Sequence, residues 1–168
     1  MDLKEWRDGR YILYIIDMFT RFTFGDFIKD KKSTTVSECL LKKWISVFGK
    51  MEILHSDGGG EFNSEELTRI AEYLDVKQTS TAAYSPNQNG TNERNHSIID
   101  RMIEKMQFEE KDLNADDALC WALAAKNSLE NYQGFAPAQR TFGENTMLPA
   151  LHSAGPPGSE EIQVSKAL

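Results

Sequence analysis

The sequence contains few cysteines and no long apolar run, and each absence excludes a class of protein. Its only cysteines, Cys39 and Cys120, stand far apart, each within an apolar stretch of helical periodicity. A structural zinc site needs clustered Cys and His ligands, so none is expected, and both thiols are predicted to be buried and reduced. No apolar run approaches the roughly 20 residues of a transmembrane helix, and no export leader opens the chain. We therefore expect a soluble chain with no membrane partner.

Positive charge is also scarce in this chain. The formal net charge is −7 and the isoelectric point is near 5.0, which argues against tight binding of duplex DNA by this chain alone. The imbalance is uneven, because residues 1–50 hold ten Lys and Arg against seven Asp and Glu, whereas residues 51–100 hold three against nine. The acidic middle either gathers carboxylates around a metal or forms a solvated surface.

What the sequence does contain is an alternation of β-prone and helical segments. The order of these segments predicts an α/β fold in which one mixed sheet is flanked by helices, in a domain of residues 1–150. Residues 151–168, near the Gly- and Pro-rich end, are predicted to form a flexible tail. Strands are predicted over residues 1–6, 11–17, 22–28, 51–55 and 76–81, and helices from a capping box at Thr35 and Glu38 to residue 48, from a cap at Asn63 or Ser64 to residue 74, from about residue 91 to 108, and over 115–131.

Two carboxylates stand out by their positions. Asp57 follows a buried strand and precedes three glycines, which would let another group approach the backbone closely. Glu93 comes after 35 intervening residues, at the start of a predicted helix and opposite its apolar stripe. Taken singly, each has an ordinary explanation, an Asp-Gly turn for Asp57 and an acidic first turn for Glu93. Together with the Ser-Pro and Asn-Gly loop before Glu93, they form a specific combination.

Three segments in this order carry a resemblance to a known family. They read ILHSDGGGEF at residues 53–62, YSPNQNGTNER at 84–94 and GFAPAQRTFG at 134–143. The pattern resembles the catalytic core of integrases from retroviruses and from gypsy-like long-terminal-repeat retrotransposons, including copies domesticated by a host genome. The resemblance extends from Asp2 to about Leu151.

The resemblance implies a set of catalytic residues. The family's third carboxylate is an Asp on the first strand, and Asp2 is the matching residue here. Asp17, which ends the second strand, is the competing choice, but family members often carry an Asp there without using it for catalysis. Asp2, Asp57 and Glu93 are thus the implied catalytic and metal-binding residues.

The resemblance also implies a fold, a cofactor and a reaction. The fold would be ribonuclease H-like, with a five-stranded mixed sheet. Three carboxylates would hold two Mg²⁺ or Mn²⁺ ions, which prefer carboxylate oxygen and stabilise the attacking and leaving oxygens of a phosphoryl displacement. The reaction would be 3′-end processing of retroelement DNA and its strand transfer into target DNA. The expected partners are DNA and further copies of the chain, as a homodimer or an intasome-like assembly, in the nucleus after a cytoplasmic phase.

Residues around the carboxylates are expected to contact substrate. His55 would point to the same side of its strand as Asp57, although a satisfied strand histidine is the alternative. Residues 84–92 are expected to form a mobile loop that closes on DNA. The expected substrate-binding residues are His55, Asn89, Asn92 and Arg94.

The helix that carries Glu93 departs from the family pattern. Many integrases have lysines one and two turns after the Glu, whereas this chain has Ser97 and Asp100, and Glu104 extends the same face. This face is expected to repel phosphate unless metal ions neutralise it.

Two other functions compete with an active integrase. One is a catalytically inactive core kept as a nucleic-acid-binding or dimerisation module, and the other is a related nuclease that cleaves RNA–DNA hybrids. For dimerisation, the helix over 115–131 offers an apolar side, with a core-facing helix as the alternative. The residues of that side are Leu119, Ala122, Leu123 and Leu129.

Overall fold

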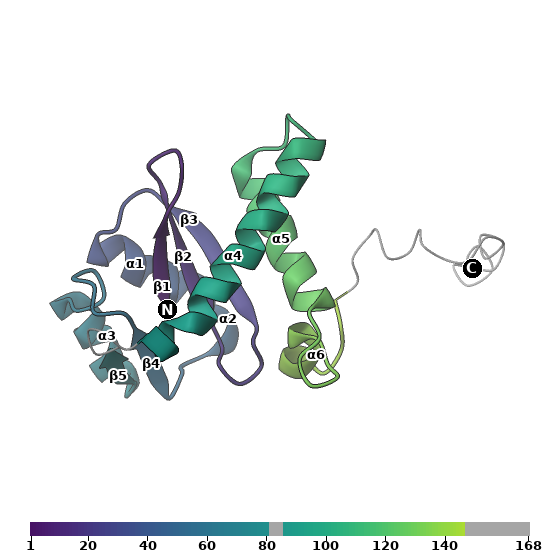
Figure 1. Cartoon of the computed structure of the whole chain (residues 1–168). Helices are drawn as coiled ribbons and strands as arrows, with labels where there is room; N and C mark the ends of the chain where they lie inside the picture. The colour runs from purple at the N-terminus through teal and green to yellow at the C-terminus, as the bar shows by residue number, and fades with distance from the viewer. Residues whose placement is uncertain (81–85, 147–168) are drawn as a thin grey trace, which may run out of the picture.

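Three antiparallel strands and a parallel pair form the β-structure of the chain (Figure 1). The structure is a computed structural model that describes residues 1–80 and 86–146, with only the backbone of residues 86–89 and 91. The strands are β1 (Asp2–Glu5), β2 (Tyr11–Ile16), β3 (Thr23–Ile28), β4 (Ile53–Ser56) and β5 (Lys77–Ser80). The helices are α1 (Ser33–Cys39), continued by the π-helical η1 (Leu40–Ile45) and by α2 (Ser46–Phe48), then α3 (Glu65–Leu74), α4 (Pro86–Glu109), α5 (Ala115–Leu129) and α6 (Pro137–Phe142).

The five predicted strands are present, but they form two sheets rather than one continuous sheet. In the first sheet β2 lies between β1 and β3, with Asp2 opposite Tyr14. In the second, β4 pairs with β5 in parallel. The backbone nitrogen of Met1 donates to the carbonyl of His55 at 2.7 Å, so the start of β1 lies beside β4. This single hydrogen bond between the chain start and β4 does not extend into a ladder, so the two sheets are not continuous.

The continuous apolar run of β2 is explained by burial of both its faces. Leu13 and Ile15 face a core that is closed by α1, η1 and α3, whereas Ile12 and Tyr14 face a second core against α4 and α5. Because successive side chains of a strand alternate between faces, one strand supplies both cores. The first core contains Met1, Leu13, Ile15, Ile28, Val36, Cys39, Leu40, Trp44, Leu54, Phe62 and Leu67, and the second contains Trp6, Ile12, Tyr14, Ile99, Ile103, Ala118, Leu119, Ala122 and Leu123.

One of the two predicted helix caps is wrong. The first helix begins at Ser33 and has no side-chain cap, so the capping box at Thr35 does not form. The Thr35 hydroxyl instead donates to Asp30 at 2.7 Å, and Asp30 also holds the turn before the helix. The cap at Ser64 is confirmed, because its side chain accepts a hydrogen bond from the Leu67 amide at 3.2 Å.

The loop expected over residues 84–92 is helical from Pro86 onward, because α4 begins there. Proline suits the first turn of a helix, where its missing N–H has no intrahelical partner to lose. The expectation of a mobile loop is therefore wrong for residues 86–92, and residues 84 and 85 lie outside the described part. The sequence analysis also missed α6, which likewise begins with a proline, Pro137.

The apolar side of α5 faces the core. Leu119, Ala122 and Leu123 are buried against β2 and α4, whereas Leu129 is 55% exposed. The core-facing alternative is thus correct for three of the four residues proposed for dimerisation. Cys39 is buried as predicted, but Cys120 is exposed, because it lies on the outer side of α5. No helix in the described ranges has the length and apolarity needed to cross a bilayer.

Gly25 is required by close packing between β3 and its neighbours. A Cβ atom at this position would lie 3.1 Å from the Tyr14 ring and 3.3 Å from Leu123. Both neighbours are buried, so neither can move freely. We expect Gly25→Ala to lower the free energy of unfolding by about 1–3 kcal/mol, through overpacking. Urea unfolding measures the change, with Gly58→Ala as the control because a Cβ at Gly58 meets nothing within 4 Å; equal losses in both variants would contradict this explanation.

Candidate active site

The three predicted carboxylates come from three elements that meet at one edge of the fold. Asp2 begins β1, Asp57 directly follows β4, and Glu93 lies on the N-terminal part of α4. The bond between Met1 and His55 brings the start of β1 next to the end of β4. Figure 1 shows α4 beginning beside β4 and the chain start. Asp2 is partly buried, with its side chain 21% exposed, whereas Glu93 is exposed.

The carboxylates are close enough to influence one another electrostatically. Burial raises the pKa of Asp2 above its ordinary value, and the negative charge of Asp57 and, more weakly, that of Glu93 raise it further. The Leu3 amide donates a hydrogen bond to Asp2 at 2.9 Å, and this bond lowers the pKa of Asp2. Like charges held together in this way favour a bound cation.

The three carboxylates are suitable ligands for a hard divalent ion, but their side chains do not surround a common position. Carboxylate oxygens are the donors that Mg²⁺ prefers. Within residues 1–80 and 86–146, however, no three His, Cys, Asp or Glu side chains are close enough together to hold a metal ion. The structure therefore brings Asp2, Asp57 and Glu93 to one edge without assembling a complete coordination shell.

The carboxylate of Asp17 accepts hydrogen bonds within the turn between β2 and β3. One of its carboxylate oxygens accepts a hydrogen bond from the Phe19 amide at 3.3 Å. The other accepts from the Thr20 amide at 3.0 Å and from the Thr20 hydroxyl at 2.6 Å. Both oxygens therefore stabilise the β2–β3 turn, and this geometry favours Asp2 over Asp17 as the candidate ligand.

His96 is a site residue that the sequence analysis missed. It follows Glu93 by one helical turn, and its ring lies on that of Tyr14 with 4.5 Å between centroids. Its Nε2 is 3.5 Å from Asp2 and makes no hydrogen bond within the described structure. Burial, and secondarily the charge of Lys4, lower the pKa of His96 to about 4. The spacing from Glu93 was the available signal, but only the fold brings this helix face against Asp2.

The low pKa of His96 predicts a loss of stability in mild acid. Between its unfolded pKa of about 6.5 and about 4, the unfolded chain binds a proton that the folded chain excludes. The free energy of unfolding should therefore fall as the pH falls through this interval, by up to about 3 kcal/mol from this group. Replacing His96 with Phe keeps the contact with Tyr14 and should remove this component.

Urea unfolding in EDTA between pH 7 and pH 4 measures the effect. Since other groups titrate in the same interval, the informative quantity is the difference between wild type and His96→Phe. That difference should change with pH, whereas the control Asn63→Ala, at an exposed position without a titratable group, should follow the wild-type profile. Parallel profiles for wild type and His96→Phe would contradict the assignment.

Of the four expected substrate-binding residues, the three whose side chains are described do not line a single pocket. His55 is exposed, and its Nδ1 is 2.9 Å from the Thr79 hydroxyl, so its ring links β4 to β5. His55 and Asn92 line one cavity of about 510 Å³, most of whose other lining residues are apolar. Arg94 lines a different pocket. The side chain of Asn89 lies outside the described part of the structure.

The acidic face of α4 is partly neutralised by basic residues from the N-terminal hairpin. Lys4 forms an ion pair with Asp100, and Arg7 forms one with Glu104. These pairs explain how two carboxylates are tolerated beside β1 without metal ions, so the expected repulsion of phosphate is reduced here. An open groove of about 500 Å³ runs along this face, and Asp2, Glu93, His96 and Asp100 are among its lining residues.

A buried amide network holds the turn of α4 that carries Glu93. Asn95 donates to the Thr23 hydroxyl at 3.2 Å. Asn127 of α5 accepts from the Thr23 amide at 2.9 Å and donates to the Thr23 carbonyl at 2.8 Å. The network ties α4 and α5 to the start of β3 and fixes the helix two residues beyond Glu93. Sequence reasoning missed it, because the hydrogen-bonded partners are 72 and 104 positions apart.

Comparisons with known proteins identify the family of this chain. The integrase core domain family matches residues 1–86. The Pol polyprotein of transposon 412 from Drosophila melanogaster is 23% identical over 158 residues, which is 91% of this chain but only 13% of that polyprotein. This chain thus spans a small part of such relatives.

Solved structures show the same fold. The catalytic core domain of human T-cell leukemia virus 2 integrase, solved in complex with magnesium, has a TM-score of 0.70 at 22% identity, over 83% of this chain and 90% of that chain. An integrase chain of the simian T-cell lymphotropic virus intasome has a TM-score of 0.75 at 21% identity, over 88% of this chain and 53% of that chain. The fold is the ribonuclease H-like α/β fold of these cores, and the chain belongs to the integrase core domain family as a core of the retroviral type.

Proposed function

We propose that this domain breaks and joins DNA strands in the integration of retroelement DNA, with Asp2, Asp57 and Glu93 as its catalytic residues. The observation that carries the proposal is the meeting of these carboxylates at one edge of an integrase fold, where burial raises the pKa of Asp2 and the charges of Asp57 and Glu93 raise it further. Family membership supports a polynucleotidyl transferase in general.

Two divalent ions would supply charge stabilisation for the attacking and leaving oxygens. Asp2 would contribute to both ions, Asp57 to one and Glu93 to the other. Magnesium in the viral core domain of the same fold supports this cofactor. Neutral His96, stacked on Tyr14, would hold Asp2 in place from the protein side.

The remaining assignments are part of the same proposal. The viral core domain is known in dimeric and trimeric forms, which supports self-association of this chain. DNA as the substrate implies a nuclear site of action after a cytoplasmic phase. A gypsy-like origin and a five-stranded mixed sheet also belong to the proposal, as does a core domain of residues 1–150 with a flexible tail.

The experiment is an oligonucleotide joining assay with the full chain in Mn²⁺ and, separately, in Mg²⁺. Labelled DNA that mimics a branched integration product detects joining and its reversal. Wild type should form products, and both EDTA and Asp57→Asn should abolish them. Asp17→Asn is the matched control and should remain active, because Asp17 serves only the β2–β3 turn.

A second candidate function follows from one specific observation. Because the described ligands do not close around a metal ion, an inactive core that binds nucleic acid or dimerises is the alternative. Wild type inactive with both ions would support this alternative and refute the enzyme. Cleavage of an RNA–DNA hybrid without any joining of duplex DNA would instead support a nuclease.

A further inference from the structure

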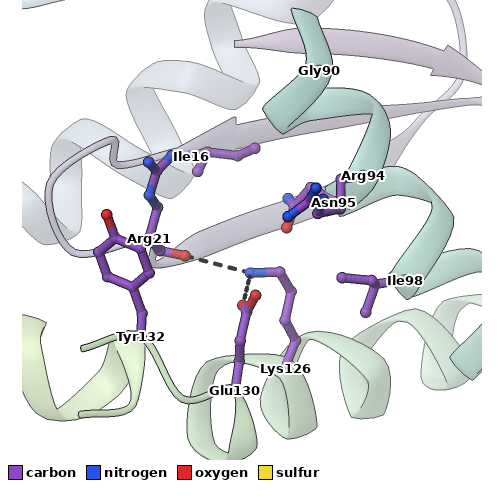
Figure 2. Close-up of a pocket in the computed structure, with 9 residues that line it drawn as sticks. All are labelled: Ile16, Arg21, Gly90, Arg94, Asn95, Ile98, Lys126, Glu130 and Tyr132. Atoms are coloured by element: carbon purple, nitrogen blue, oxygen red, sulfur yellow. Dashed lines mark hydrogen bonds and ion pairs between the residues drawn. The ribbon is translucent and has the colours of Figure 1, made fainter. Parts of the chain in front are cut away.

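The pocket that Arg94 lines lies on a different face of α4 from the carboxylate groove. Figure 2 shows its lining residues. The pocket has a volume of about 340 Å³, within the size range of sites that bind small ligands or parts of larger ones. Arg94 and Asn95 of α4 form one wall, and Arg21 of the β2–β3 turn forms another. Lys126 of α5 and Glu130, which directly follows this helix, form the floor in the view of Figure 2.

The charge of this pocket is opposite to that of the chain. Arg21, Arg94 and Lys126 line the pocket together with a single carboxylate, that of Glu130. The Lys126 side chain is only 2% exposed, and its ammonium donates to Glu130 at 2.8 Å and to the Arg21 carbonyl at 3.4 Å. These bonds use two of its three N–H donors. A buried ammonium with a free donor provides a binding position for an anion.

The two guanidinium groups also lack acidic partners. Across the described ranges, no carboxylate lies within 4 Å of Arg21 or Arg94, whereas Arg7, Arg10 and Arg69 are all paired. Arg21 is held in place, since its guanidinium lies 5.2 Å from the centre of the Tyr132 ring. A guanidinium group that is held in place and has no acidic partner can donate two hydrogen bonds to the oxygens of one phosphate.

The position of the pocket relates it to the carboxylates. Glu93 and Arg94 are adjacent on α4, so they project from the same turn about 100° apart. A helix with its side chains is about 10 Å across, and a DNA strand advances about 3.4 Å per nucleotide. A strand that passes the carboxylates therefore reaches Arg94 within a few nucleotides.

We propose that Arg94, Lys126 and Arg21 bind a backbone phosphate of the DNA strand, a few nucleotides away from the phosphate that lies at the carboxylates. This inference rests on the proposed function, because it assumes that DNA lies at Asp2, Asp57 and Glu93. The pocket compensates for the acidic groove by supplying cations that the Glu93 face of α4 lacks.

The experiment measures binding of a fluorescent twelve-nucleotide single-stranded DNA to the full chain in EDTA, where metal-dependent chemistry is absent. Arg94→Gln should weaken binding about ten-fold and reduce the slope of log affinity against log salt by about one. Lys126→Met should have a similar effect. Glu130→Gln should strengthen binding, because it removes the competing carboxylate. Arg69→Gln on α3, far from the pocket in sequence and already paired with Glu65, should change nothing.

Two results would overturn the inference. The first is unchanged affinity in Arg94→Gln, an exposed position that can be replaced without loss of folding. The second is equally tight binding of inorganic phosphate alone, which would make a free anion the occupant instead of a DNA strand. Either failure is distinct from failure of the proposed function, since joining that depends on Asp57 is measured separately and requires metal.

Discussion

Asp2→Asn is expected to abolish DNA joining while making the metal-free protein more stable. Removing one ligand of a pair of catalytic ions costs several kcal/mol of transition-state stabilisation, so joining should fall at least about 100-fold. The stability gain has a separate cause. Burial and the charges of Asp57 and Glu93 raise the pKa of Asp2 in the folded state, so its ionisation there is unfavourable.

The pH dependence of this effect has a definite sign. Below the unfolded pKa, Asp2 is protonated in both states and contributes nothing. As the pH rises through the raised folded pKa, the unfolded chain releases its proton more readily, and the wild type loses stability that Asp2→Asn retains. The stability difference between the two proteins in EDTA should therefore widen with rising pH.

Divalent metal should reverse the order. An ion that binds only the folded state stabilises it in proportion to the logarithm of its concentration over the dissociation constant. Thermal unfolding in a Mg²⁺ titration should therefore stabilise the wild type and leave Asp2→Asn nearly unchanged. Asp17→Asn is the control and should respond to metal as the wild type does. A variant that is less stable in EDTA, or equally stabilised by Mg²⁺, would contradict the assignment of Asp2.

Asn127→Ala is expected to lower the free energy of unfolding by about 2–6 kcal/mol. Its side chain satisfies both the amide and the carbonyl of Thr23, and all these groups are buried. Truncation leaves two backbone groups without partners, each at a cost of about 1–3 kcal/mol. Asn63→Ala is the matched control, because that side chain is exposed and should cost little.

The same variant should also weaken metal binding, because Thr23 anchors Asn95, which lies two residues beyond Glu93. Guanidinium unfolding and isothermal titration with Mn²⁺ measure the two effects. A stability loss below about 1 kcal/mol would show that water replaces the Asn127 amide. A normal Mn²⁺ affinity in the destabilised variant would show that the network supports the fold alone.

The ends of elements were predicted least well, for reasons that lie in local competition. Thr35 satisfies the sequence rule for a helix cap, but its hydroxyl donates a hydrogen bond to the nearby Asp30 instead. The polar run before Glu93 has the composition of a loop, yet α4 begins at Pro86. The side of α5 taken for a dimer face is mostly a core face, since hydrophobic periodicity does not show what a helix packs against.

The sequence by itself determined the family, the order of strands and helices along the chain, and the three candidate carboxylates, because these depend on local pattern and on ordered motifs along the chain. Only the tertiary structure decided that His96 lies against Asp2 and that Lys4 and Arg7 neutralise the α4 face. It also decided that Arg21, Arg94 and Lys126 share one pocket. The physical reason is that burial, pKa and charge compensation depend on contacts between residues about 70 to 105 positions apart, and these contacts exist only after the chain has folded.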